Sequence, residues 1–569
     1  MAVVVIERTE VDGVPAVVAH TSGPARAGLL LRVGQADETL ARRGITHLLE
    51  HLLLHPLGQA DYHYNGSTGN VVTHFHLQGP VDAVTDFLAS VCRSVQNLDD
   101  ARIEIEKSIV LTEEGGRVTG PLDDMPLWRY GARDHGLVSF PQWGLHNVTA
   151  DDLREWAARH FTRGNAVLWF AGAELPAGLK LDLPNGVRQP VPSPSSALPS
   201  TPAFFVGSSH ATALDAVVRD RPAGRVLAGV LERRLFRALR QEAGLSYTTA
   251  TNYDSRGDGF AVLSALADAL PGKQDAVLGG FLDVLAALRV GRIDEDDVTS
   301  VVSRAAAALE GDDADAARLP SVAFQLLTDQ PVLDRDQLVR ELKAVDAASV
   351  RDAAAEALES ALLKTPLGTT AQWAGFTAAP TGSTAAPAPA ASDKHHPSGV
   401  DPAERLTVGL EHVSRVNPDR QATTVRFDNC AALLAFPDGG RLLVGNDAVS
   451  VRIEPTIYRG VDTAAIDAGV PTQRRIAMPA REPGQIPQPR RPGTKGAQAA
   501  LLRTRQLDVR QKVTLGVFAV LTVVMGGVAL AVSIAMAVGA TPLRPLPAIG
   551  AWIAAGYFAR KLRTQWTEA

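Results

Sequence analysis

The stretch RRGITHLLEHLLLHP at residues 42–56 decides how the N-terminal part of this 569-residue chain is interpreted. Its apolar residues recur at helical spacing, which predicts a helix that follows Gly44. His47 and His51 are four residues apart, so on a helix both imidazoles project from one face and can share a metal ion. Glu50 lies at the rim of that face. The rest of the helix is apolar, and burying these polar side chains without partners would be costly. Their presence in such a helix therefore indicates a functional site.

The spacing H-x-x-E-H is typical of one class of zinc hydrolases. A catalytic zinc ion binds three protein ligands and keeps one position open for water, whose pKa falls toward about 7, and a nearby base takes the proton. His47 and His51 supply two ligands, and Glu50 is placed as the base. The motif alone leaves a structural interpretation open, since amphipathic helices often carry His and Glu as solvated or capping residues. The third ligand has to come from elsewhere in the chain.

The longer segment RVGQADETLARRGITHLLEH, residues 32–51, resembles the N-terminal active-site segment of the pitrilysin/insulinase family of zinc metallopeptidases. In that family a downstream helix carries two glutamates seven residues apart, and the second binds zinc. Glu106 and Glu113 have this spacing, which is two helical turns, and so share a face. The resemblance implies that Glu106 orients the metal ligands. It implies one Zn²⁺ per chain, held by His47, His51 and Glu113.

Two further segments resemble substrate-binding parts of the same family. GSTGNVVT, residues 66–73, is similar to a strand in which Asn70 would hold substrate along the strand edge. LFRALRQEAGLSYTTATNY, residues 235–253, contains the family's R-x-x-x-G-L-x-Y signature. There Arg240 and Tyr247 would bind substrate and stabilise the tetrahedral intermediate. Taken singly, Asn70 fits a turn, Arg240 a helix-surface cation and Tyr247 the edge of a core; their order and spacing favour the substrate-binding roles.

The rhythm of strands and helices predicts an α+β fold with two similar pitrilysin-type αβ domains, a half clamshell. Residues 1–174 would form the zinc-binding peptidase domain and residues 203–365 the second domain, and their similar size and element order suggest an internal duplication. Segments rich in Pro, Gly, Ala, Ser or Arg predict connections. These are a linker at 175–202, a disordered Ala/Pro linker at 366–400, and a linker with a basic flank at 481–512.

Residues 401–480 predict a small β-rich module, either a barrel or a pleckstrin-like sandwich. Their Pro-Asp-Gly-Gly sequence at 437–440 is a hairpin signal. The module contains no catalytic constellation. The histidine pair at 395–396 precedes it and is interpreted as inert.

The C-terminal tail is strongly apolar. Residues 513–543 contain no charged side chain, and residues 513–540 are long enough for a transmembrane helix. Residues 545–559 predict a second membrane segment or an interfacial one. Basic residues flank both stretches, and the N-terminus has no signal-peptide pattern. We therefore expect a protein tail-anchored in the cell membrane, with its catalytic domains on the cytoplasmic side.

Composition excludes several classes of protein. The net charge of −6 provides no basic field, so we expect no nucleic-acid partner. The two cysteines, Cys92 and Cys430, are too few for a disulfide framework or a cysteine-rich zinc site. Hydrophobic residues at 46% and charged residues at 21% are typical of a globular protein.

The resemblance implies a zinc-dependent endopeptidase that hydrolyses peptides or small unfolded proteins. Family members enclose peptides in a clamshell of four αβ domains, whereas this chain supplies two. We therefore expect a homodimer in which each zinc site faces Arg240 and Tyr247 of the other subunit, and a heterodimer with an inactive paralogue is the second choice. The alternative class is a non-proteolytic partner subunit or a membrane scaffold. Retention of the general base Glu50 favours the enzyme.

Overall fold

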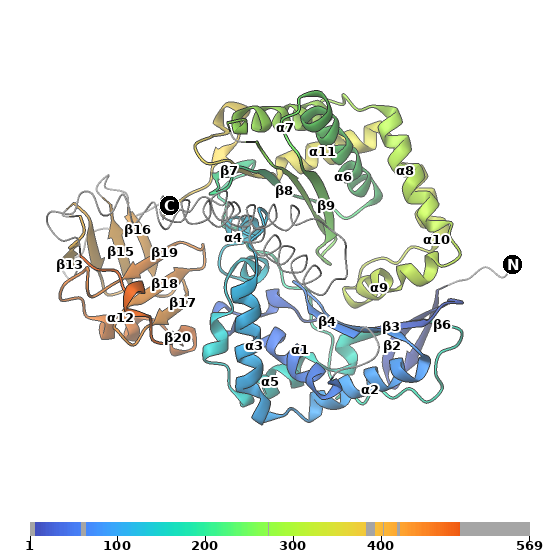
Figure 1. The fold of residues 1–569 in the computed structure, drawn as a ribbon, viewed down its shortest axis with the longest axis horizontal. Coiled ribbons are helices and arrows are strands. Elements are labelled where there is room, and N and C mark those ends of the chain that lie inside the picture. The colour runs from blue at the N-terminus through green and yellow to red at the C-terminus, as the bar shows by residue number, and fades with distance from the viewer. Residues whose placement is uncertain are drawn as a thin grey trace, which may run out of the picture. The chain divides into compact units, whose positions relative to one another are not determined.

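The computed structural model describes residues 6–58, 64–270, 272–382, 393–401, 403–417 and 422–489. The chain up to residue 487 belongs to one compact unit with two αβ domains and a β-rich module (Figure 1). The predicted membrane segments, residues 513–540 and 545–559, lie outside the described residues. Among the helices that are described, none is long and apolar enough to cross a bilayer.

The first domain is a six-stranded sheet whose strands follow the order β1-β2-β6-β3-β5-β4. Only β2 and β6 run parallel. Helices α1 and α2 bury their apolar residues against one face of this sheet, around Leu29, Phe75 and Phe170. The strands are β1 (Glu7–Val11), β2 (Val14–His20), β3 (Ala25–Leu31), β4 (Tyr64–Thr68), β5 (Thr73–Gly79) and β6 (Ala166–Gly172). The helices are α1 (Ile45–Leu54), α2 (Val81–Gln96), α3 (Ile103–Gly116), α4 (Met125–Tyr130) and α5 (Ala150–His160).

The second domain has a sheet of its own, with the order β12-β7-β11-β8-β10-β9. Helices α6, α7 and α11 pack on one face of this sheet around Leu263, Phe281 and Val350. The strands are β7 (Ala203–Val206), β8 (Thr212–Arg219), β9 (Thr249–Ser255), β10 (Phe260–Ala267), β11 (Leu362–Thr365) and β12 (Thr377–Ala378). The helices are α6 (Pro222–Leu235), α7 (Gln274–Arg289), α8 (Glu295–Leu309), α9 (Ala314–Leu327), α10 (Arg335–Lys343) and α11 (Ala347–Glu359).

The two domains repeat one topology, in agreement with the predicted duplication. The order β2-β6-β3-β5-β4 in the first sheet matches β7-β11-β8-β10-β9 in the second. The parallel pair β2·β6 corresponds to the parallel pair β7·β11, and the remaining pairs in both series are antiparallel. Helix α1 before edge strand β4 therefore corresponds to α6 before edge strand β9. The two sheets differ in the outermost strand beside β2 or β7, which is β1 in one domain and β12 in the other.

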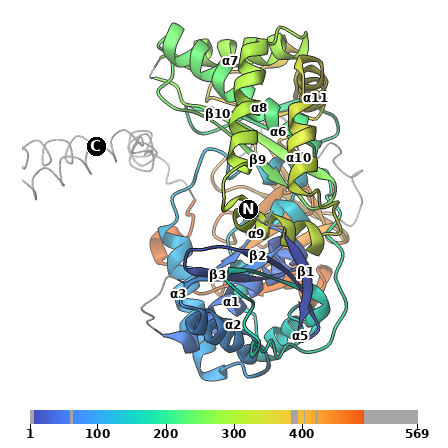
Figure 2. The same ribbon diagram turned by 90° about the vertical axis from the view of Figure 1, so that its right-hand side faces the viewer.

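Helix α9 ties the second domain to the first. Its residues Leu319, Val322 and Leu327 pack on Val17 and Trp169, on the face of the first sheet opposite α1 and α2. Figures 1 and 2 show α9 lying against that sheet. Helices therefore cover both faces of the first sheet, and the helix on one of these faces, α9, belongs to the second domain.

The β-rich module consists of two four-stranded sheets and one short helix. Its strands are β13 (Lys394–Pro397), β14 (Arg405–Val408), β15 (His412–Val416), β16 (Ala422–Arg426), β17 (Cys430–Ala435), β18 (Arg441–Gly445), β19 (Ser450–Ile453) and β20 (Arg475–Ala477), and its helix is α12 (Thr463–Gly469). The predicted hairpin at 437–440 is confirmed, because this turn joins the antiparallel strands β17 and β18. The amide N–H of Phe436 donates to the carbonyl oxygen of Gly440 at 3.0 Å across the turn.

The expected linkers correspond only in part to the structure. Residues 175–202 contain no helix or strand, but Leu181 is fully buried in the first core. The predicted disordered linker at 366–400 is too long at both ends, because β12 extends the second sheet and β13 begins the module. The pair His395 and His396 lies in β13, where the Nδ1 atom of His396 is 3.0 Å from the Arg459 carbonyl oxygen.

A buried ion pair between Arg129 on α4 and Asp215 on β8 joins the two αβ domains. Arg129 Nη2 also donates to the Asp215 carbonyl oxygen at 2.6 Å. We expect Arg129→Ala to lower the free energy of unfolding by about 3–5 kcal/mol, because it leaves the Asp215 carboxylate buried without its partner. Denaturant titration measures this loss. Arg154→Ala, which breaks an exposed pair with Asp100, is the control and should change stability far less.

Candidate active site

A buried carboxylate fixes the start of the motif helix α1. Glu38 accepts hydrogen bonds from the backbone N–H groups of Gly44 and Thr46, each at 2.9 Å. These groups have no partner within the helix, and a negative charge at this end is favoured by the helix dipole. Arg43 donates to Glu38 at 3.2 Å and to the Leu137 carbonyl oxygen at 2.9 Å. Gly44 has φ of 102° and lies so close to Gln142 that a side chain there would meet the Gln142 amide.

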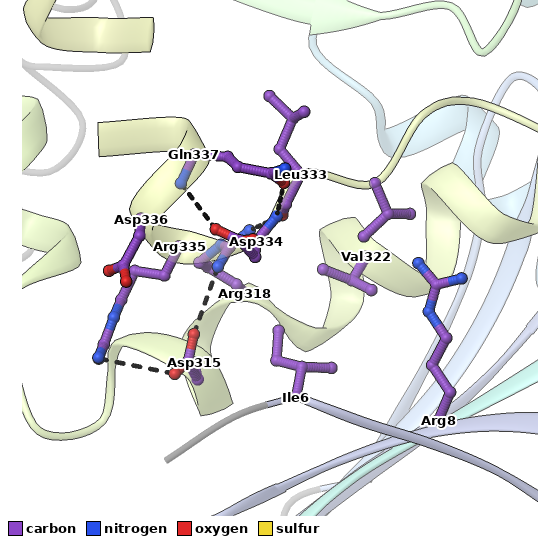
Figure 3. A pocket seen from close by; sticks show the side chains of 11 residues that line it. Ile6, Arg8, Asp315, Arg318, Val322, Leu333, Asp334, Arg335, Asp336 and Gln337 are labelled. Carbon is purple, nitrogen blue, oxygen red and sulfur yellow. Dashed lines mark hydrogen bonds and ion pairs between the residues drawn. The ribbon is translucent and has the colours of Figure 1, made fainter. Parts of the chain in front are cut away.

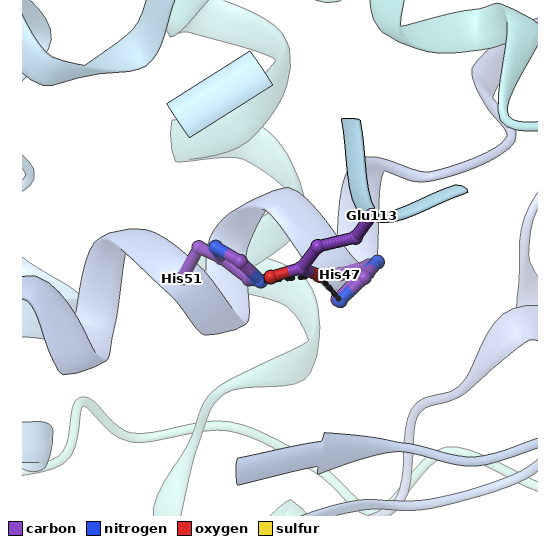
Figure 4. A group of neighbouring side chains, drawn as sticks. All are labelled: His47, His51 and Glu113. Atoms are coloured by element: carbon purple, nitrogen blue, oxygen red, sulfur yellow. Dashed lines mark ion pairs between the residues drawn. The ribbon is translucent and has the colours of Figure 1, made fainter. Parts of the chain in front are cut away.

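Helices α1 and α3 bring the three predicted metal ligands together. The Nε2 atoms of His47 and His51 lie 3.8 and 3.5 Å from the same carboxylate oxygen of Glu113. Figure 4 shows both imidazoles on α1 facing the Glu113 side chain. The two rings are nearly perpendicular, with centroids 4.8 Å apart. One donor atom from each residue falls within a cluster 4.8 Å across.

The other nitrogen of each imidazole has its own partner. His51 Nδ1 lies 3.3 Å from Glu106, and His47 Nδ1 lies 3.2 Å from the side-chain oxygen of Gln142. Arg102 donates to the second oxygen of the buried Glu106 carboxylate at 2.6 Å. Such partners select the tautomer that leaves Nε2 as the metal-binding atom. Glu106 is therefore the partner of the His51 imidazole, and Gln142, which no sequence pattern predicts, is the partner of the His47 imidazole.

The three donors suit a zinc ion. Zinc bound tetrahedrally at about 2.0–2.1 Å holds its nitrogen and oxygen ligands about 3.3 Å apart. The separations of 3.5 and 3.8 Å from Glu113 to the imidazoles are close to that value, and all three donor atoms lie within 4.8 Å of one another. Glu113 is half-exposed, with 53% of its side chain accessible, so solvent reaches the cluster from that side.

Glu50 is buried on the same helix, next to the cluster. Thr68 at the end of β4 donates to its carboxylate at 2.6 Å. Burial raises the pKa of Glu50 above its ordinary value, although the Thr68 hydrogen bond and nearby His47 oppose the rise and Glu113 adds to it. The edge strand passes so close that a methyl group on Gly66 would lie 2.6 Å from a Glu50 oxygen. The carboxyl group is therefore held in one position between α1 and the strand edge.

Asn70 lies in the turn between β4 and β5, at the wall of a cavity of about 440 Å³ between the two αβ domains. Its side-chain nitrogen is 3.0 Å from His135 Nδ1. Its side-chain oxygen is buried and has no hydrogen-bond partner among the described residues. Tyr130 and Arg256 line the same cavity and are hydrogen-bonded at 3.1 Å. The amide predicted to hold substrate is thus engaged with His135 in this structure.

Arg240 and Tyr247 form a separate pair on the second domain. Arg240 lies in a π-helical segment, Phe236–Glu242, that continues α6, and its guanidinium carbon is 4.9 Å from the centre of the Tyr247 ring. Tyr247 is 70% exposed. Among the described contacts, none joins this pair to His47, His51 or Glu113. The fold therefore brings His47, His51 and Glu113 together, whereas Arg240 and Tyr247 form a separate pair on the other domain.

Several site residues were missed in the sequence. Gln142 and Thr68 have no fixed spacing to the histidines, so only the fold brings them into contact. Glu114, the neighbour of Glu113 on α3, accepts the backbone N–H of Gln142 at 2.8 Å and so holds the loop that contacts His47. Glu38 lies seven residues before Ile45, outside the N-cap position and the first turn, so no sequence signal indicates its role at the start of α1 either.

A second cavity, of about 380 Å³, lies between the start of β1 and helices α9 and α10 (Figure 3). It is lined by Arg8, Arg318 and Arg335, and Asp315 lies 3.3 and 3.6 Å from the latter two. Its charges are largely paired, and it contains no acid or base placed beside a nucleophile. The His47–His51–Glu113 cluster is the better candidate for chemistry.

No family model matches this sequence, and no curated protein matches it. Solved structures do resemble the fold. A protease from Helicobacter pylori is 16% identical with a TM-score of 0.54, over 64% of this chain and 100% of that one. An inactive domain of peptidase M16 from Pseudomonas fluorescens is 14% identical with a TM-score of 0.54, over 64% and 98%. The first half of the periplasmic protease PqqL from Escherichia coli is 12% identical with a TM-score of 0.51, over 64% and 92%.

These likenesses establish a mixed α/β, peptidase-like fold of the M16 type. Identities of 12–16% carry the fold alone, and one of the three structures is described as inactive. The chemistry of this chain therefore has to be argued from its own site.

Loss of a ligand should abolish metal binding. We expect the wild-type chain to hold about one zinc ion and the variants His47→Ala and Glu113→Gln to hold almost none, because three protein ligands are required. Metal analysis of the purified protein measures the ratio. His210→Ala, which removes an exposed histidine of the second domain, should retain zinc; equal zinc in all four proteins would contradict the site.

Proposed function

We propose that this protein is a zinc-dependent endopeptidase that hydrolyses peptides or small unfolded proteins. The observation that carries the proposal is the convergence of both Nε2 atoms on the Glu113 carboxylate, with Nδ1 of each ring held from behind. A purely structural pair of histidines has no need of this arrangement. The peptidase-like fold supports the same reaction class.

The site residues have separable roles in this reaction. His47, His51 and Glu113 would hold the zinc ion, which when bound supplies a Lewis acid that acidifies water and polarises the peptide carbonyl group. Glu50 accepts a proton from water at its carboxylate and delivers it to the leaving amine nitrogen. Thr68 keeps this carboxylate oriented through its hydroxyl group. Glu106 and Gln142 keep both imidazoles in the tautomer that binds metal.

We further propose that two chains form the working enzyme. Arg240 and Tyr247 are exposed and stacked on each other, as expected of groups that act on a substrate held by another surface. A similar fold forms the first half of a longer protease. A homodimer would place this pair opposite the zinc site of the other subunit, and pairing with an inactive paralogue is the second choice.

Two parts of the proposal concern the setting of the enzyme. The uncharged run at 513–543 supports a C-terminal membrane anchor, with the catalytic domains on the cytoplasmic side. A non-proteolytic partner subunit or membrane scaffold is the competing function, because an inactive domain shares the fold. Activity of the purified chain separates the two functions.

Cleavage of quenched fluorescent peptides by the wild-type chain should be abolished by a chelator and restored by zinc. We expect Glu50→Gln to lower kcat by about 100-fold or more, the usual contribution of a general base. Its zinc content should stay at the wild-type level, which separates loss of the base from loss of the fold. Glu104→Gln, an exposed glutamate of α3 paired with Lys107, is the matched control and should cleave normally. Wild-type protein without chelator-sensitive cleavage would favour the scaffold.

Mixing two inactive variants tests the dimer. Glu50→Gln and Arg240→Ala should each be inactive alone, yet a mixed dimer contains one site with both residues intact. Random pairing should restore about one quarter of the wild-type activity, since half of the dimers are mixed and each has one intact site of two. An active monomer in mass photometry, together with no rescue on mixing, would show that one chain is sufficient.

A further inference from the structure

The β-rich module is docked on the domain that holds the zinc motif. Strands β18, β17 and β20 of the sheet β19-β18-β17-β20 lie against short segments of the first domain in a shared apolar cluster. The module contributes Ala431, Ala432, Leu434, Val444 and Ile476 to this cluster, and the first domain contributes Leu40, Ala41, Ala132, Leu137 and Phe140. All ten are buried.

Hydrogen bonds to the backbone of the module fix its position on this surface. The side chain of Asn147 donates to the Arg475 carbonyl oxygen at 2.9 Å and accepts the Ala477 N–H at 3.2 Å, so it pairs with strand β20. The N–H of Ala132 donates to the carbonyl oxygen of Asn446 at 3.0 Å. Because the contact between the module and the first domain includes paired polar groups as well as apolar ones, the two surfaces fit together in one defined position.

The segments that the module covers adjoin residues that contact the start of α1 and the His47 imidazole. Leu40 lies just before Arg43, which braces the Glu38 cap of α1 and donates to the Leu137 carbonyl oxygen. Phe140 lies two residues before Gln142, the partner of His47. The module therefore supports, from behind, both the cap of the motif helix and the loop that orients its first histidine.

We propose that the β-rich module is a positioning element of the metal site, and that its docking sets the zinc affinity of His47, His51 and Glu113. The inference rests on the proposed function, since it requires that these residues bind zinc. Leu434, Ile476 and Asn147 are positioning residues that act through the loop of Gln142 and the cap of α1. The segments at 40–41 and 132–140 have no regular sheet of their own to brace them, so the module provides the rigid surface.

The chain offers a matched pair of variants on one strand. Leu434 and Leu433 are adjacent on β17, are both buried, and point to opposite faces. Leu434 belongs to the contact with the first domain, whereas Leu433 belongs to the core of the module. Truncating either to alanine removes the same volume from a packed interior. Only Leu434→Ala removes it from the surface behind the zinc ligands.

The test measures zinc affinity of the full-length chain by competition with a fluorescent chelator, alongside thermal unfolding. We expect Leu434→Ala and Asn147→Ala to weaken zinc binding at least about fivefold, the lower end of typical coupling between separate sites. Leu433→Ala should bind zinc like the wild type, and Leu434→Met, which keeps most of the volume, should restore the affinity lost in Leu434→Ala.

Two failures are distinguishable. Wild-type zinc affinity in both Leu434→Ala and Asn147→Ala would overturn this inference alone. An equal loss in Leu433→Ala would overturn it too, because the effect would then follow general loosening of the module. Failure of the wild-type chain to bind zinc would instead overturn the proposed function.

Discussion

The site depends on one buried ionic contact, in which the Glu38 carboxylate lies at the N-terminus of α1. This group pairs with Arg43 and accepts the free backbone N–H groups at the start of the helix. Because α1 has no polar side chain of its own at the N-cap, Glu38 determines where the helix begins and hence the rotation at which His47 and His51 meet α3. The face of α1 that packs on the sheet is apolar, so the helix cannot shift without opening the core. Two constraints of different kind therefore fix the imidazoles.

Duplication explains how the proposed chemistry is divided. In each αβ domain a helix lies after the third strand of the common series and leads to the edge strand. In the first domain this helix carries the zinc motif, and Thr68 on the following edge strand contacts Glu50. In the second domain the corresponding helix ends in the segment of Arg240, followed by Tyr247 and edge strand β9. Equivalent positions of one repeated fold thus present metal ligands in one copy and a cation–aromatic pair in the other.

The domains are held together by unlike contacts. Helix α9 covers the first sheet with apolar side chains, Arg129 and Asp215 form a buried ion pair, and the β-rich module closes over the loops behind the zinc motif. Hydrophobic contact is non-directional and supplies area, while the ion pair and the Asn147 hydrogen bonds fix register. A module that sequence alone presents as a separate appendage is part of the same compact unit as the peptidase-like domains.

The sequence by itself determined the local features: the helix with two histidines on one face, the second helix with Glu106 and Glu113 two turns apart, the hairpin at 437–440 and the repeated αβ order. Each follows from periodicity or turn chemistry within a few residues. The tertiary structure decided which distant groups meet, namely Gln142 with His47, Thr68 with Glu50 and the module with residues 40–41 and 132–140. Those contacts depend on how elements far apart in the sequence pack against one another, and no spacing along the sequence encodes that packing.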